Sequence, residues 1–272
     1  LPVIETLHPL IVLFVEFQDQ VPQNLVVEQY QLDALERDPL LEDLLKGLQD
    51  SQQQITLEAE QYIIDGINDK DSYGLTPLMN AIQQQEQLLV IARLLQLGAS
   101  TESVDEYGMT PFMYAAWLHP SYRTAALLLR SSSDVEARDV EQWTALMRAV
   151  LNPNPEVLQA VLTEGADVDG ENAEGWTALT FAAGFSEELK PIEMLLEAGA
   201  DIDHQCIDGM TPLMYAAAFN HNPEMILYLL DAGADAQIED YWGGSAYEYA
   251  RQNRQLRGSD ALDALERASH QQ

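Results

Sequence analysis

Positive charge is scarce in this chain of 272 residues, which holds 13 lysines and arginines against 45 aspartates and glutamates. The formal net charge is −32, and only Lys46, Lys70 and Lys190 are lysines. Such a surface repels nucleic-acid phosphates and anionic lipid headgroups, so we expect neither a nucleic acid nor a membrane as partner. It attracts basic proteins at low salt, although a device for solubility or an adaptation to salty surroundings explains the charge equally well.

Cysteine is nearly absent as well, because Cys206 is the only one. A single thiol cannot form an internal disulfide, so disulfides do not hold this fold together. The five histidines, which are also candidate metal ligands, are scattered, and none pairs with another at a spacing of four residues: His8, His119, His204, His221 and His270. A zinc site needs three or four converging ligands, so we predict no metal site. Motifs for phosphate loops, dinucleotide binding or a nucleophilic serine are missing too, and we predict no cofactor, no catalytic residue and no enzymatic activity.

Long apolar runs are also lacking. The longest, from Leu10 to Val15, is far shorter than the roughly 20 residues that a membrane-spanning helix needs. No basic segment precedes it, so it does not read as an intact signal peptide. The chain begins at Leu1, and a removed leader would favour a periplasmic or exported location over a cytoplasmic one, whereas a trimmed sequence would say nothing about location.

What the chain does contain is a repeated phrase. Its copies share a glycine or glutamine, a large apolar residue or glycine, and a threonine or serine at 76, 110, 144, 177, 211 and 245, which are 34, 34, 33, 34 and 34 residues apart. A second phrase keeps pace with the first, as Gly98-Ala99-Ser100, Gly165-Ala166-Asp167, Gly199-Ala200-Asp201 and Gly233-Ala234-Asp235. A period of this length is typical of a solenoid built from one small unit.

This pattern resembles the ankyrin repeat, which opens with G-x-T-P-L-H-x-A-A and closes with L-L-x-x-G-A-D. The resemblance covers about residues 69–250. It implies an all-α solenoid of five repeats plus a degenerate C-terminal capping repeat, each with two helices and a hairpin finger. The usual histidine is Met79, Met113, Met147, Thr180 or Met214 here, and Gln142 replaces a glycine in the third copy. These departures affect local loop shapes and not the fold.

Elementary physics agrees with this assignment. Threonine before Pro-Leu is a good N-cap, and proline suits the first helical turn, where its missing N–H would be unpaired anyway. Glycine after the leucines ends the second helix in a left-handed conformation. No unit can bury its apolar face alone, so the units must stack.

The two ends differ from the middle. Residues 1–68 lack the repeated phrase, and their apolar spacing predicts a helical N-terminal capping region, with a separate binding element as the alternative. Residues 69–250 are the ankyrin-like repeats, and residues 251–272 are predicted to be a C-terminal capping helix and tail.

A partner is expected on the finger tips and on the exposed side of each first helix, where ankyrin-like solenoids commonly bind. Placing the sequence on that pattern gives twelve candidate partner-binding residues: Tyr73, Leu75, Tyr107, Met109, Trp117, Trp143, Trp176, Phe185, Met210, Phe219, Tyr241 and Trp242. Tryptophan, tyrosine and methionine are enriched at the centres of protein interfaces. The alternative for each aromatic residue is packing between neighbouring fingers.

The sequence therefore favours a monomeric, non-catalytic module that binds another protein with a basic surface through an acidic, aromatic-rich concave and finger face. Its sharper form is an inhibitor or immunity protein for a bacterial enzyme. The alternative is a scaffold or adaptor that joins two proteins.

Overall fold

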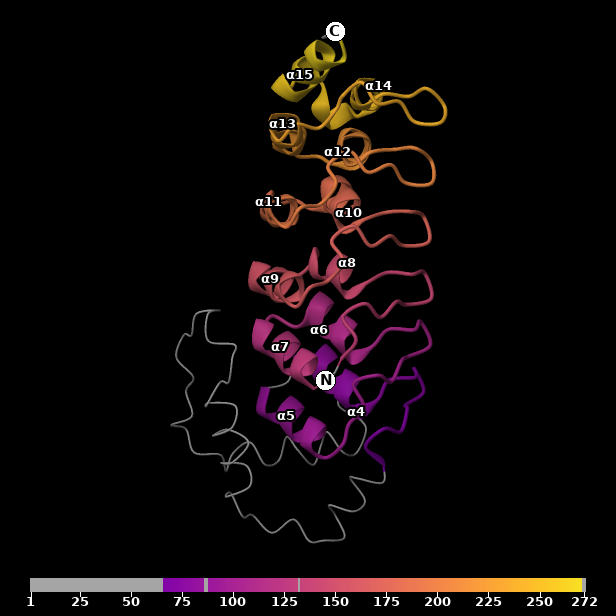
Figure 1. Ribbon diagram of the computed structural model, residues 1–272, viewed down its shortest axis with the longest axis vertical. Helices are drawn as coiled ribbons and strands as arrows, with labels where there is room; N and C mark the ends of the chain where they lie inside the picture. Colours follow the sequence, from indigo (N-terminus) through magenta and orange to yellow (C-terminus); the bar gives the residue numbers. More distant parts are fainter. Residues whose placement is uncertain (1–65, 86–87, 132, 271–272) are drawn as a thin grey trace.

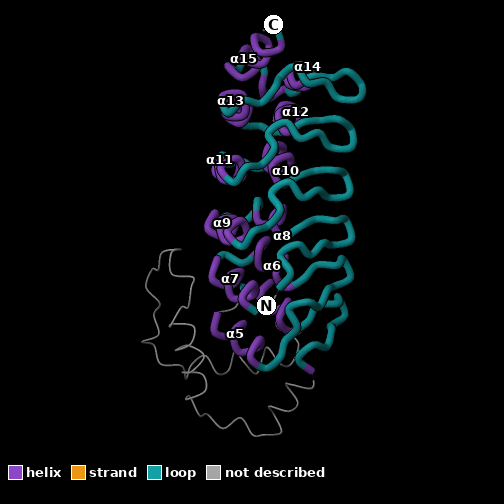
Figure 2. The backbone as a smooth tube through the Cα atoms, in the orientation of Figure 1, coloured by secondary structure: helices purple, strands orange, loops and turns teal. Residues whose placement is uncertain are grey.

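The computed structural model describes residues 66–85, 88–131 and 133–270. These residues form helix pairs stacked one on the next into an elongated solenoid (Figure 1), and two isolated bridges are the only β-structure in this part of the chain. A long loop, which we call a finger, precedes the first helix of each repeat and projects beside it (Figure 2). Repeats and fingers are numbered one to six along the chain.

Each repeat gives one helix to each of two rows. The first-helix row consists of α4 (Pro77–Gln83), α6 (Pro111–Leu118), α8 (Ala145–Ala149), α10 (Ala178–Phe185), α12 (Pro212–Phe219) and α14 (Ala246–Gln252). The second-helix row consists of α5 (Leu88–Gln96), α7 (Tyr122–Arg130), α9 (Pro155–Thr163), α11 (Lys190–Glu197), α13 (Pro223–Asp231) and α15 (Asp260–Ser269). A short 3₁₀ helix, η4 (Arg254–Leu256), connects α14 to α15.

The first helices begin where the sequence predicts. In every repeat the cap hydroxyl accepts the backbone N–H of the residue three positions on, at 3.2 to 3.4 Å, and the caps are Thr76, Thr110, Thr144, Thr177, Thr211 and Ser245. A cap of this kind contributes about 1 kcal/mol. The second helices α5, α9, α11 and α13 are each followed by a glycine with φ between 85° and 103°, as the left-handed turn requires.

The core runs the whole length of the stack. Small residues let neighbouring first helices approach, and Ala115, Ala116, Ala182, Ala183, Ala216 and Ala217 are all buried. The methionines that replace the usual histidine, Met79, Met113, Met147 and Met214, are buried too, and they fill apolar volume as predicted.

Neighbouring fingers are joined by backbone hydrogen bonds. In four successive pairs, a tip N–H donates to a tip carbonyl of the preceding finger: Val140 to Tyr107, Ala173 to Glu141, Ile207 to Glu174 and Tyr241 to Asp208, at 2.9 to 3.2 Å. Nearer the finger base, backbone N–H groups donate to side chains of the preceding finger. The Asp201 N–H donates to Asp169 Oδ1 and the Asp235 N–H donates to Asp203 Oδ1, each at 2.9 Å. The fingers therefore form a continuous layer beside the first-helix row.

At the C-terminus the predicted capping helix is present as α15, with Leu265 buried against the last repeat. The predicted N-terminal capping region falls almost entirely on residues outside those described. The domain boundaries at residues 68 and 250 stay predictions.

Candidate functional site

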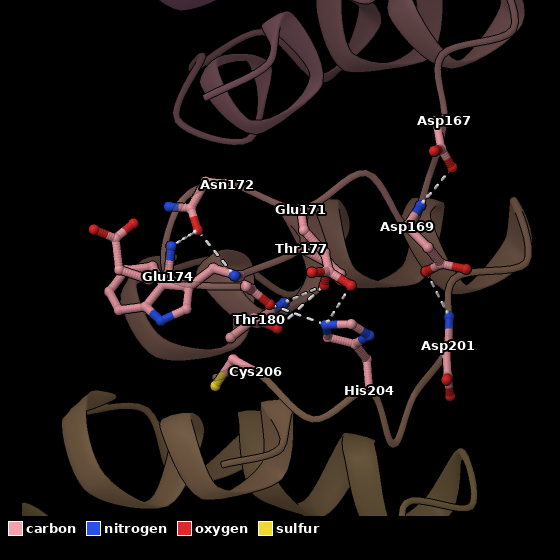
Figure 3. Close-up of polar contacts among 12 residues, drawn as sticks. Asp167, Asp169, Glu171, Asn172, Glu174, Thr177, Thr180, Asp201, His204 and Cys206 are labelled. Atoms are coloured by element: carbon pink, nitrogen blue, oxygen red, sulfur yellow. Dashed lines mark hydrogen bonds and ion pairs between the residues drawn. The ribbon is translucent and has the colours of Figure 1, made fainter. Parts of the chain in front are cut away.

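In five of the six fingers, one side chain at the base accepts two backbone N–H groups of the finger. In finger two, Asp105 is buried and its Oδ1 accepts the backbone N–H of Tyr107 at 2.9 Å and of Met109 at 2.8 Å. Asp71, Asp139, Asn172 and Asp240 hold their fingers with the same pair of bonds, and Figure 3 shows those of Asn172. These side chains fix the direction in which the finger tip points.

The residue after the tip has a left-handed backbone in every finger. Five fingers have glycine there, with φ between 73° and 82°: Gly74, Gly108, Gly175, Gly209 and Gly243. Finger three has Gln142, with φ 65°. A residue with a Cβ is strained in this conformation by about 1 to 2 kcal/mol, so finger three is the least relaxed of the six.

The finger base is also tied to the first helix of its own repeat. In repeat two the Tyr114 hydroxyl donates to Asp105 Oδ2 at 2.7 Å. Burial and this hydrogen bond raise the pKa of Tyr114, so the hydroxyl keeps the proton that it donates. Equivalent pairs are Asn80 with Asp71, Arg148 with Asp139, Tyr215 with Cys206 and Tyr249 with Asp240, and the Tyr215 hydroxyl also donates to Asp208.

Repeat four is the exception. Phe181 stands where the other repeats have a hydrogen-bonding side chain, nine residues after the finger base, which is Asn172 in this repeat. Asn172 is only 6% exposed, and its Nδ2 is a buried donor without a hydrogen-bond partner. An unmet donor in such a place costs about 1 to 3 kcal/mol. Repeat four therefore lacks the hydrogen bond between the finger base and the first helix, and it has an aromatic ring in place of the donor.

That ring is part of a continuous aromatic patch, which we define as Trp143, Trp176, Phe181, Phe185, Tyr215 and Phe219. Ring centroids of neighbouring members are 4.7 to 6.3 Å apart. Trp143 and Phe181 meet edge to face at 4.7 Å, and Phe185 and Phe219 are stacked at 5.8 Å. Phe185 and Phe219 are 43% and 48% exposed. The patch spans repeats three to five along the first-helix row and presents apolar surface to solvent.

Arg148 borders the patch. Its guanidinium carbon lies 5.0 Å from the Trp143 ring centroid and 5.5 Å from that of Trp117, and the same group pairs with Asp139. Trp117 thus joins the patch through Arg148. The positive charge is neutralised by Asp139 and covered by two rings, so it does little to offset the acidic surroundings.

Those surroundings are strongly negative, since residues 101–250 contain 26 acidic and 5 basic side chains. Glu141 and Glu174 are exposed on the fingers two residues before Trp143 and Trp176. Glu187 and Glu188 are exposed just after α10. The patch is therefore an apolar surface with an acidic rim.

The structure brings together four of the twelve predicted residues directly, since Trp143, Trp176, Phe185 and Phe219 all belong to the patch. Four others, Tyr73, Tyr107, Tyr241 and Trp242, are exposed at finger tips, and among the described residues no ring contact links them to the patch. Trp242, at 75% exposure, is the most open of them.

The structure corrects three of the predicted binding residues. Leu75, Met109 and Met210 are buried, and they belong to the core. Each follows the left-handed glycine of its finger, where the chain turns back toward the stack, so the side chain packs between repeats and does not reach a partner.

The sequence argument also missed residues. Phe181 and Tyr215 are not among the predicted residues because they lie inside apolar helix segments, and their rings link the patch. Val140 and Ile207 are exposed on finger tips, and the alignment of the repeated phrase would have found them because each directly follows a finger-base residue.

Polar chemistry is sparse in the described part of the chain. No group of three or more histidine, cysteine, aspartate or glutamate side chains there is arranged to hold a metal ion. Cys206 occupies the base of finger five, with its Sγ 2.8 Å from Asp208 Oδ1 and 3.0 Å from the Met210 carbonyl. Burial, reinforced by the hydrogen bond with Asp208, raises the pKa of this thiol to about 11, which makes it a structural group and a poor nucleophile.

Comparison with known families agrees with the geometry. A family model that is described as three copies of the ankyrin repeat matches four overlapping ranges of the chain, residues 50–139, 121–206, 146–240 and 188–262. The chain belongs to the ankyrin-repeat family. Ankyrin repeats are generally modules for protein–protein interaction and are typically non-catalytic. The comparison with curated proteins finds no match. Among the residues that the structure describes, no helix of this ankyrin-repeat protein is both long and apolar enough to span a bilayer.

Proposed function

We propose that this ankyrin-repeat protein is a non-catalytic binding module whose aromatic patch and acidic rim take up a partner with an apolar centre and a basic rim. The observation that carries the proposal is the exposure of Phe185 and Phe219, stacked at 5.8 Å in the middle of a strongly acidic stretch of chain. Burying two such rings against a partner removes apolar area from water, while the acidic rim steers a basic protein toward it.

The sharper form of the proposal is an inhibitor or immunity protein for a bacterial enzyme. An enzyme that binds an anionic substrate carries a basic rim around its active site. An acidic surface laid over that rim blocks access by occlusion and needs no chemistry of its own.

An adaptor that joins two proteins is the second candidate. Its support is the separate position of Tyr241 and Trp242, which are exposed on finger six and have no ring contact with the patch among the described residues. A second partner bound there would leave the patch free.

Affinity capture from the native cell lysate tests both candidates. Three baits are compared: the wild-type protein, a Phe185→Ala/Phe219→Ala variant, and a Tyr241→Ala/Trp242→Ala variant as the matched control. All four side chains are exposed, so each pair can be truncated without opening the core.

A basic protein that the wild type and the finger variant retain, and that the patch variant loses, supports binding through the patch. Its retention should weaken as salt rises, and the captured protein, if it is an enzyme, should be inhibited by the wild type. Loss of different proteins from the two variants supports the adaptor. Identical captures by all three baits would refute both surfaces.

A further inference from the structure

Side-chain amides bridge several joints between repeats at the ends of the first helices. Asn152 Nδ2 donates to the carbonyls of Ala116 and His119, both at 3.0 Å, and so joins repeat three to repeat two. Asn220 joins repeat five to repeat four in the same way, and Asn253 joins repeat six to repeat five. Each bridge satisfies carbonyls that end a helix and fixes the spacing of two repeats.

The joint between repeats three and four has no such bridge. The equivalent residue is Ser186, whose hydroxyl donates to the Glu188 carbonyl at 3.0 Å, inside its own loop. Serine is also too short to reach as far as an asparagine amide. The loop end of repeat four is therefore not tied to repeat three by this side chain.

The first helices pack weakly at the same joint. The helix α8 has only five residues, and it shares few contacts with α10, whereas α6 packs closely on α8 and α10 packs closely on α12. Three buried polar atoms lack a hydrogen-bond partner in the described part of the chain, and all lie in the two repeats that flank the joint or in their fingers: Ser133 Oγ, Arg148 Nε and Asn172 Nδ2.

What crosses this joint lies mostly on the finger side. The Ala173 N–H donates to the Glu141 carbonyl at 3.1 Å, and the Asp167 N–H donates to Glu136 at 2.8 Å. On the first-helix row, the ring of Trp143 meets the ring of Phe181 at 4.7 Å. The joint is thus held along the fingers and by aromatic contacts of the patch.

We infer that the solenoid opens at the joint between repeats three and four, so that the repeats form two arms and the finger bonds across the joint break when it opens. Trp143 stands on one arm, and Trp176, Phe181 and Phe185 stand on the other. Opening the joint changes the shape of the aromatic patch, and a partner that contacts both arms closes it. This closing role rests on the proposed function, whereas the opening itself does not.

Amide hydrogen exchange on the isolated full chain tests the opening. The N–H groups of Val140, Ala173 and Ile207 make equivalent bonds across three successive joints, at 2.9, 3.1 and 3.2 Å, so fraying of finger tips affects all three alike. We expect the Ala173 amide to exchange about tenfold faster than the other two, because its joint opens most often.

Two matched variants add the asparagine bridge at one joint and remove it at the next. Ser186→Asn should supply the missing amide and slow exchange at Ala173 by about tenfold, while Asn220→Ser should speed exchange at Ile207 and leave Val140 unchanged. Equal protection of the three amides in the wild type would overturn the inference, and so would a Ser186→Asn variant that folds and leaves Ala173 unchanged.

Binding is measured in a different experiment, so the proposed binding surface and the opening of the joint can be refuted independently. If the capture experiment yields no partner, the exchange rates still decide whether the joint opens. If a partner binds through the patch and leaves the Ala173 amide as fast as before, the closing role is wrong although the binding surface is right.

Discussion

Replacing Asn172 by aspartate and Phe181 by tyrosine would give repeat four the pair that holds repeat two, where Tyr114 donates to Asp105 at 2.7 Å. The single change Asn172→Asp puts a buried carboxylate oxygen in the place of the unpaired Nδ2, and should cost about 1 to 3 kcal/mol. Phe181→Tyr alone adds a hydroxyl that the Asn172 amide can reach, so we expect a change within about 1 kcal/mol.

In the double variant the new hydroxyl donates to the new carboxylate. Hydrogen bonds to charged groups are worth about 1.5 to 3 kcal/mol, so the double variant should be more stable than the two single changes predict by about 2 kcal/mol. Urea unfolding followed by far-ultraviolet circular dichroism at pH 7 measures this coupling energy. If the chain unfolds in two stages, the stage that contains repeat four should carry the change.

The reverse cycle at repeat two is the control. The changes Asp105→Asn and Tyr114→Phe give repeat two the residue pair of repeat four. Together they should destabilise the protein, because they create the same unmet amide. A coupling energy below about 0.5 kcal/mol at repeat four would show that the finger base and the first helix do not interact there, and would refute the reasoning.

Three further predictions concern finger geometry, burial and pH. Gln142→Gly should stabilise the protein by about 1 kcal/mol in thermal unfolding, whereas Gly243→Gln, where an added Cβ meets only the Glu239 side chain at 3.9 Å, should destabilise it by a similar amount. Equal effects of the same sign would contradict this. Met210→Ala should cost about 2 to 5 kcal/mol in urea unfolding because Met210 is core, while Tyr241→Ala should change stability by less than about 0.5 kcal/mol. Between pH 9.0 and about 11 the folded Cys206 thiol keeps its proton while the unfolded one loses it, so the free energy of unfolding should fall as pH rises through this window, and Cys206→Ala should flatten that fall relative to the wild type.

The fold was predictable because its signals are local and repeated. A threonine cap followed by proline and a closing glycine recur in register, and each needs only its own neighbours in sequence to form. The period of 34 residues then gives the size of each unit, and an apolar face on each unit requires stacking.

The candidate site was less predictable because it depends on directions that neighbouring repeats set. Met210 and Trp176 occupy the same place in the repeated phrase, yet Met210 is buried and Trp176 belongs to the patch, since a larger ring extends beyond the gap between fingers. The unmet amide of Asn172 goes with a change nine positions along the chain, where Phe181 replaces the hydrogen-bonding side chain of the other repeats. The weak joint needs the contrast of Ser186 with Asn220, which the repeated phrase does not include.

The finger-to-finger hydrogen bonds all run in one sense, with each N–H directed toward the preceding finger. The outer edge of finger six therefore presents acceptors, and a further copy stacked there would meet the same kind of edge that finger six meets on finger five. Growth by duplication of a whole unit requires no new kind of contact at the junction, whereas a unit inserted backwards would set acceptor against acceptor. Whole repeats can consequently be gained or lost during evolution, and only the terminal repeat needs a polar outer face.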